Sequence, residues 1–180
     1  MLMQILDILA TKSKEHGVQF IVIGGHAVNA YGERRQTGDL DIMVRETGRN
    51  IWEDLLTSMG YVLYHRHNAF SQFRPPAIEV WPIDLMFVED KTFDGLLAES
   101  REVNFGGTQN VRIPSIEHLI ALKLNVLRQV GKERELKDLA DIVALVKVGK
   151  LDVTGKGFRL LCEKYGTVSI YEQIVDAIDR

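Results

Sequence analysis

Three aspartates have a spacing and a sequence environment that favour a functional role over a purely structural one. Asp39 and Asp41 are separated by one residue at the start of an apolar run, and Asp84 lies inside a second apolar run, residues 81–88. Residues two apart on a β-strand point to the same face, so the first two carboxylates should lie side by side. An aspartate inside an apolar strand is hard to explain as structure, because burying an unpaired charge is costly.

Carboxylates held this close repel each other, and a hard divalent cation removes the conflict. Mg²⁺ takes oxygen ligands and is commonly held by one or two carboxylates together with substrate phosphates. The alternative for Asp39 and Asp41 is a solvated strand end after a turn at Gly38. Two glycines upstream, Gly24 and Gly25, favour the metal site. Glycines let the backbone approach a ligand closely, and a helix that starts after a strand can seat a phosphate.

The elements that must position these residues form a small mixed sheet. Apolar runs predict strands over 18–23 and 40–44, with a short helix over 26–31 between them. Residues 78–88 predict a long strand that carries Asp84 and is irregular at Pro82. The other expected elements are helices over 1–16, 49–59 (capped by Thr47) and 93–99, strands over 61–65 and 70–73 (a short edge strand), and a hairpin of 102–105 with 110–113.

The last third of the chain is predicted to be helical, with helices over 116–129, 133–148, 155–165 and 169–179. The fold class is therefore α+β (α/β), a small mixed sheet flanked by helices and followed by a C-terminal helical lobe. We expect a core over residues 1–113 and a lobe over 114–180, packed on the core as one compact unit.

Composition excludes several classes of protein. The 180 residues carry a formal net charge of −3, which argues against a protein that coats nucleic acid electrostatically. One cysteine, Cys162, excludes an internal disulfide framework and fits a reducing cytoplasm, with a place in a helix core as its expected role. No apolar run approaches the roughly 18 residues of a membrane span, so no membrane partner is expected.

Gly24-Gly25, followed after thirteen residues by Asp39-Leu40-Asp41-Ile42, resembles the signature of the DNA polymerase β-type nucleotidyltransferase superfamily. The resemblance implies the nucleotidyltransferase fold, with Asp84 as the third carboxylate of the metal site. Relatives often carry Arg-x-Thr just before the acidic pair, which Arg35-Gln36-Thr37 matches. Arginine suits bidentate contact with phosphate. The alternative for Arg34 and Arg35 is a solvated basic loop.

Further motifs resemble the AbiEii-like nucleotidyltransferases, which include toxins of toxin–antitoxin systems. They are Pro114-Ser115-x-Glu117-His118-Leu119, Lys123-Leu124-Asn125-Val126-Leu127-Arg128 and Lys137-Asp138-Leu139-Ala140-Asp141. With the first signature, the resemblance covers roughly residues 18–145. It departs at Gly25, where serine is frequent, and His26 beside it either reaches the phosphates or is structural.

The resemblance implies that Asp39, Asp41 and Asp84 hold Mg²⁺ (or Mn²⁺), and that a nucleoside triphosphate gives its monophosphate to a hydroxyl acceptor. The implied catalytic residues are Asp39, Asp41, Asp84, Lys123 and Asp138, and the implied nucleotide-binding residues are Gly24, Gly25, Arg35, Thr37 and Lys123. Acceptors left open are a tRNA or other RNA, a protein hydroxyl, and a small molecule such as an aminoglycoside; a cognate antitoxin protein is the implied partner.

Lys123 lies in an apolar helical stretch, so it must reach the surface or meet an anion. We expect it in the cleft of the acidic trio, with Asp138 orienting it and Asp141 a less certain member. A basic cluster of Arg128, Lys132, Arg134 and Lys137 favours RNA as the acceptor. The rival hypotheses are a catalytically inactive nucleotide-binding or antitoxin-partner module on the same fold, and a nucleotide-sensing or structural protein. Three intact carboxylates argue against the first of these.

Overall fold

The computed structural model describes residues 2–33, 35–129 and 135–178. They form two compact units, one of Met1–Ala30 with Arg34–Ser115 and one of Tyr31–Glu33 with Ile116–Arg180. The division after Ser115 falls two residues beyond the boundary expected at residue 113. The packing of the helical lobe on the core stays a prediction.

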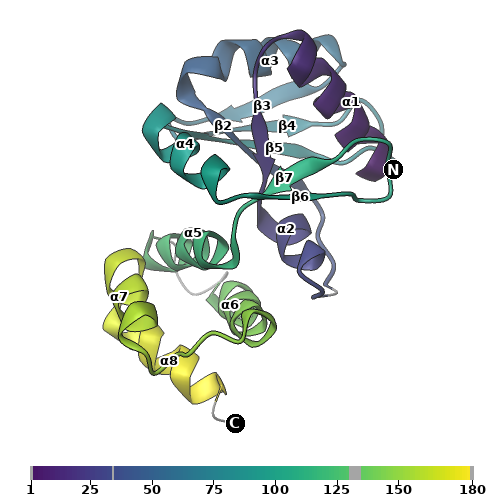
Figure 1. Ribbon diagram of the computed structural model, residues 1–180. Helices are drawn as coiled ribbons and strands as arrows, with labels where there is room; N and C mark the ends of the chain where they lie inside the picture. Colours follow the sequence, from purple (N-terminus) through teal and green to yellow (C-terminus); the bar gives the residue numbers. More distant parts are fainter. Residues whose placement is uncertain (1, 34, 130–134, 179–180) are drawn as a thin grey trace. The chain divides into compact units, whose positions relative to one another are not determined.

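A five-stranded mixed sheet forms the centre of the first unit, as the sequence predicted (Figure 1). The strand order is β1-β2-β5-β4-β3. Only β2 and β5 pair in parallel, and the other neighbours are antiparallel. The strands are β1 (Phe20–Val22), β2 (Leu40–Arg45), β3 (Val62–Arg66), β4 (Phe70–Arg74) and β5 (Ile83–Val88).

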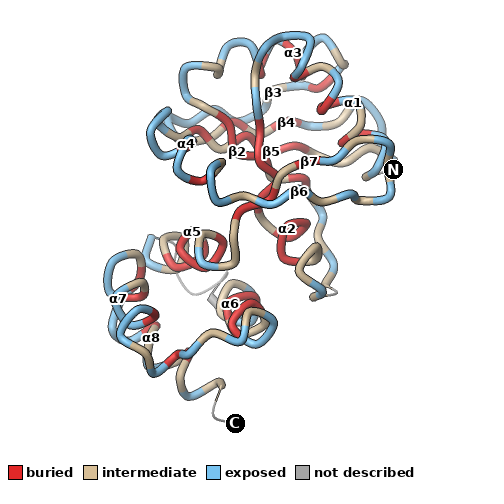
Figure 2. The backbone as a smooth tube through the Cα atoms, in the orientation of Figure 1, coloured by how far each residue is buried: buried red, intermediate tan, exposed pale blue. Residues whose placement is uncertain are grey.

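Alternation of side chains turns residues 40, 42 and 44 of β2 and residues 83, 85 and 87 of β5 toward one face of the sheet, and Asp41 and Asp84 toward the other, where Met43 is also fully buried. On β5, residues 83, 85 and 87 are buried, whereas Asp84 between them is only half-buried. Helices α1 (Leu2–Glu15) and α3 (Arg49–Ser58) lie together on one side of the sheet and α2 (Gly24–Ala30) lies on the other (Figure 1). Fully buried Trp52 of α3 packs edge-on against Phe20 of β1. Burial is accordingly densest along β1, β2 and β5 (Figure 2).

The first unit is completed by the 3-10 turn η1 (Glu46–Gly48), α4 (Asp90–Ala98) and a separate hairpin of β6 (Arg101–Val103) and β7 (Val111–Ile113).

The second unit consists of α5 (Ile116–Gln129), α6 (Glu135–Gly149), α7 (Lys156–Tyr165) and α8 (Val168–Ile178). Its core is built from Leu124, Ile142, Cys162 and Ile174, one from each helix and all fully buried. Burial raises the pKa of the Cys162 thiol to about 11, which fits its expected structural role. No helix of the described chain is both long and apolar enough to cross a membrane.

Three predicted details are wrong. Residues 70–74 are not an edge strand: β4 lies between β5 and β3, with Ser71 and Phe73 fully buried, and β3 forms the edge. The strand expected over 78–88 begins only at residue 83, because Pro82 has no N–H for strand pairing. Thr47 does not cap α3, since its hydroxyl donates to Asp90 and the helix begins after Gly48.

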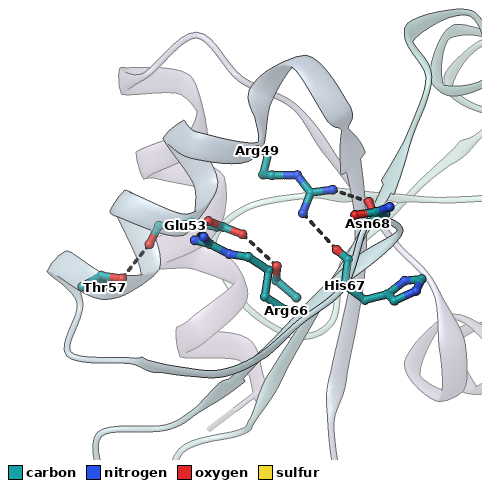
Figure 3. Close-up of polar contacts among 7 residues, drawn as sticks. Arg49, Glu53, Thr57, Arg66, His67 and Asn68 are labelled. Carbon is teal, nitrogen blue, oxygen red and sulfur yellow. Dashed lines mark hydrogen bonds and ion pairs between the residues drawn. The ribbon is translucent and has the colours of Figure 1, made fainter.

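A buried carboxylate ties α3 to the β3–β4 hairpin. Glu53 accepts a hydrogen bond of 2.7 Å from the hydroxyl of Ser71 and forms an ion pair with Arg66 (Figure 3). One turn earlier, Arg49 donates to the backbone carbonyls of residues 67 and 68. The hairpin is thus fixed to α3 by charge-assisted bonds, which are stronger than neutral ones.

Asp7 makes an analogous connection from α1 to the β6–β7 loop. Its carboxylate accepts hydrogen bonds from the backbone N–H groups of Thr108 (2.9 Å) and Gln109 (2.8 Å). These bonds hold the pKa of Asp7 below its ordinary value.

We expect Asp7→Asn to destabilise the protein in a pH-dependent way. The folded pKa of Asp7 lies below the unfolded value of about 3.9, so its stabilising effect is complete above the unfolded value. That effect disappears as the pH falls through the folded pKa. The melting temperature of Asp7→Asn should therefore lie below that of wild type near pH 7, and the gap should narrow as the pH falls below about 3.9. Circular dichroism melts across this range measure it, with exposed Asp54→Asn as control. A gap that stays constant with pH would contradict the assignment.

Candidate metal and nucleotide site

The parallel pairing of β2 with β5 brings the three aspartates together. Asp41 stands directly opposite Asp84 in the register, and Asp39 precedes Asp41 by two residues. One carboxylate oxygen from each of the three residues lies within 4.8 Å of the others. All three side chains are half-buried, so they are accessible to a ligand. This spacing fits a cation with Mg–O distances of about 2.1 Å, because two ligands on opposite sides of such an ion are roughly 4 Å apart.

Gly24 allows Asp41 to lie against the start of α2. A Cβ on Gly24 would stand 2.0 Å from Oδ2 of Asp41, and the residue has a φ of +62°, which favours glycine. A side chain at this position would therefore strain the backbone and displace a carboxylate of the trio.

Gly25 has the same function for the loop that follows α2. A Cβ there would lie 2.6 Å from the hydroxyl of Thr37 and 2.8 Å from Nη2 of Arg35. The sequence pattern predicted that the two glycines let the backbone approach a ligand closely. The structure shows that the missing Cβ atoms leave room for side chains of the site itself, Asp41 at Gly24 and Thr37 with Arg35 at Gly25. Contact of Gly24 and Gly25 with the phosphates of a nucleotide stays a prediction.

Arg35 and Thr37 are thereby placed beside the trio. The hydroxyl of Thr37 lies 3.3 Å from Oδ1 of Asp39, to which it donates a hydrogen bond. Asn29 holds the backbone of Arg35 on both sides of its Cα, because it donates to the Arg35 carbonyl (2.9 Å) and accepts from the Arg35 N–H (3.2 Å). Asn29 was missed by sequence reasoning, because a polar residue near the end of a short helix has many ordinary uses. Arg34 lies outside the described residues.

His26 is buried rather than presented to solvent. Its ring packs edge-on against Trp81, with 4.9 Å between the ring centroids. Burial lowers the pKa of His26, and Arg35 lowers it further, while Asp39 opposes the shift. The uncharged ring is therefore favoured, which fits the structural interpretation better than a cationic contact with phosphate.

In the helical unit, Lys123 meets two carboxylates. Its Nζ lies 2.8 Å from Oδ1 of Asp138 and 2.5 Å from Oδ2 of Asp141. The Lys123 and Asp141 side chains are buried, and Asp138 is nearly so. The structure thus joins the three residues that the sequence singled out. Because the triad carries one net negative charge, Lys123 is already neutralised within its own unit. Its predicted place beside the acidic trio and the nucleotide stays a prediction.

The basic cluster proposed for RNA is only partly covered by the structure. Arg128 and Lys137 are exposed on α5 and α6. Lys132 and Arg134 lie outside the described residues, as does the turn expected at Gly131.

A mixed sheet with one aspartate on each of the paired strands β2 and β5 and a third just before β2, all converging beside a Gly-Gly helix start, is the arrangement of a nucleotidyltransferase. The family described as "Uncharacterised nucleotidyltransferase" matches residues 1–175, so the chain belongs to that family. The protein is a nucleotidyltransferase, a class that uses nucleoside triphosphates and a divalent metal. The family match does not extend to the narrower AbiEii-like toxins.

Solved structures share the fold. One is ANT(2″)-Ia in complex with adenylyl-2″-tobramycin, with a TM-score of 0.68, 15% identity and coverage of 91% of this chain and 96% of that one. A second is the lincosamide antibiotic adenylyltransferase LnuA, bound to lincomycin (TM-score 0.56, 19% identity, 82% and 95% coverage). A third is the Megavirus polyadenylate synthase (TM-score 0.56, 15% identity, 81% and 31% coverage). A comparison with curated proteins finds no match. At these identities the likeness concerns the fold alone.

We expect Gly24→Ala to be severely destabilising and Gly38→Ala to be tolerated. A non-glycine residue in the left-handed region costs about 1–2 kcal/mol, and at Gly24 the clash with Asp41 adds to this cost. A Cβ on Gly38 meets nothing within 4 Å. Urea unfolding followed by fluorescence measures both free energies of unfolding. Equal losses in the two variants would show that the close approach of Asp41 to Gly24 is wrong.

Proposed function

We propose that the protein is a Mg²⁺-dependent enzyme that transfers a nucleoside monophosphate from a nucleoside triphosphate to a hydroxyl acceptor. The observation that carries the proposal is the convergence of carboxylate oxygens of Asp39, Asp41 and Asp84 within 4.8 Å of one another. A protein that only binds a partner gains nothing from three repelling carboxylates at one point. This argues against the inactive-module alternative.

Each part of the site has a role in that reaction. Asp39, Asp41 and Asp84 would hold the divalent cation, which when bound offsets the charge of the triphosphate and of the transition state. Asp84 takes the proton of the acceptor hydroxyl. The acceptor oxygen then bonds to the α-phosphorus while the bond to the β-phosphate oxygen breaks, and pyrophosphate leaves. Arg35, held by Asn29 beside Thr37, contacts the phosphates through its planar guanidinium.

The acceptor that we propose is an RNA hydroxyl, such as a tRNA 3′ end, with a cognate antitoxin as the protein partner. Support comes from the toxin-like motifs around Lys123 and Asp138 and from the exposed cations Arg128 and Lys137. Lys123 and Asp138 are proposed to complete the active site. A small-molecule hydroxyl is the second candidate, favoured by the near full-length likeness in fold to ANT(2″)-Ia.

Labelling with each radioactive nucleoside triphosphate in the presence of Mg²⁺ distinguishes these acceptors. We expect label to enter the RNA fraction of a total cell extract, in a form sensitive to ribonuclease. Label that appears only in protein would redirect the proposal to a protein hydroxyl, and label on an added aminoglycoside would support the second candidate. The control is protein carrying Asp41→Asn, which should label nothing.

Asp41→Asn itself tests the metal site. The change is nearly isosteric, so the fold should persist, while one charge that attracts the cation is lost. A ligand that binds only the folded state raises its stability, by about 2.7 kcal/mol at a hundredfold excess over Kd. We expect ATP or another triphosphate with Mg²⁺ to raise the melting temperature of wild type and of the exposed control Asp54→Asn, but not of Asp41→Asn. A metal-dependent shift of wild-type size in Asp41→Asn would overturn the assignment.

A further inference from the structure

Gln72 on β4 links the neighbouring strand to the carboxylate trio. Its amide Nε2 donates a hydrogen bond of 2.7 Å to Oδ2 of Asp84. The register of β4 against β5 places Gln72 directly opposite Asp84. Directly opposed residues share a face and have neighbouring Cβ atoms. The contact is therefore fixed by backbone pairing rather than by a loop.

The backbone of Gln72 is held from the other face of the sheet. Ser71 and Phe73, which flank it, are fully buried. The hydroxyl of Ser71 donates to Glu53, which also pairs with Arg66 of the adjacent strand (Figure 3). Helix α3 thus fixes β4 on one face, while Gln72 restrains Asp84 on the opposite face.

The residue type at position 72 suits a cation site. An amide donates a hydrogen bond without adding charge, so the trio keeps three formal negative charges for a divalent cation. A lysine or arginine would neutralise Asp84, and a glutamate would add repulsion. A hydrogen bond to one carboxylate oxygen restrains the rotation of the group, as partners of metal-ligating side chains do in other proteins.

We propose that Gln72 is a positioning residue of the metal site. It fixes the Asp84 carboxylate in the orientation that binds the cation and meets the acceptor hydroxyl. This inference rests on the proposed function. A merely structural cross-strand pair would affect the stability of the fold, whereas a positioning residue changes the metal affinity of a protein that is still folded.

The test is a titration with Mn²⁺, without nucleotide, that follows the free ion by electron paramagnetic resonance. Gln72→Met keeps the approximate length of the side chain but removes the donor, and Gln72→Asn keeps a donor. Arg74→Met is the matched control, because Arg74 is exposed and lies two residues along on the same face of β4. Asp84→Asn reports the loss of the ligand itself.

We expect Gln72→Met to raise the Mn²⁺ dissociation constant about tenfold, with an unchanged number of ions at saturation and a metal-free melting temperature close to that of Arg74→Met. Gln72→Asn should recover part of the affinity. If Gln72→Met fails to fold, Gln72→Val, which suits a strand and lacks a donor, takes its place.

Two results would overturn the inference in different ways. If Gln72→Met binds Mn²⁺ as tightly as wild type while Asp84→Asn binds it more weakly, Gln72 is not a positioning residue. The proposed function is unaffected by that result. Equal Mn²⁺ affinity in wild type and Asp84→Asn would show that the three aspartates do not form the metal site. Both proposals would then be wrong.

Discussion

The parallel pairing of β2 with β5 places Asp41 opposite Asp84, and the rest of the first unit follows from the need to hold that pair. Carboxylates this close repel each other, so the strands must be kept in register by something stronger. Apolar side chains at 40, 42, 83 and 85, all fully buried on the reverse face, supply that force. A shift by one residue would turn the aspartates into the apolar core, so the register is strongly specified.

The same pairing explains why the glycines and the loop after α2 are arranged as they are. Asp41 points toward the start of α2, and only a residue without a Cβ leaves room for it there. Gly25 leaves comparable room for Thr37 and Arg35, and Asn29 fixes the loop by two hydrogen bonds to the backbone of Arg35. The site is thus assembled from three consecutive segments, a helix start, a loop and a strand start. Its fourth component, Asp84, comes from the strand beside them.

Much of this could be predicted from sequence, because the informative patterns are local. Alternation around Asp41 and Asp84 identified both strands, and helical spacing located α1, α3 and the helices of the second unit. Gln72 could not be found this way, since its role depends on which residue the pairing register places opposite it. The same non-local information was missing for β4: five residues with few apolar side chains resemble an edge strand, and burial by α3 is visible only in three dimensions. Thr47 resembled a cap until Asp90, distant in sequence, was found beside it.

The buried thiol in the helical unit has a practical consequence. Cys162 is the only cysteine in the sequence, is fully buried, and has a pKa raised to about 11. A thiol reagent reacts with the thiolate, so it can label this chain only after α7 separates from its neighbours. The rate of labelling therefore measures how often the helical unit opens. Opening confined to the sheet leaves Cys162 covered, so the chain carries its own reporter for one unit alone.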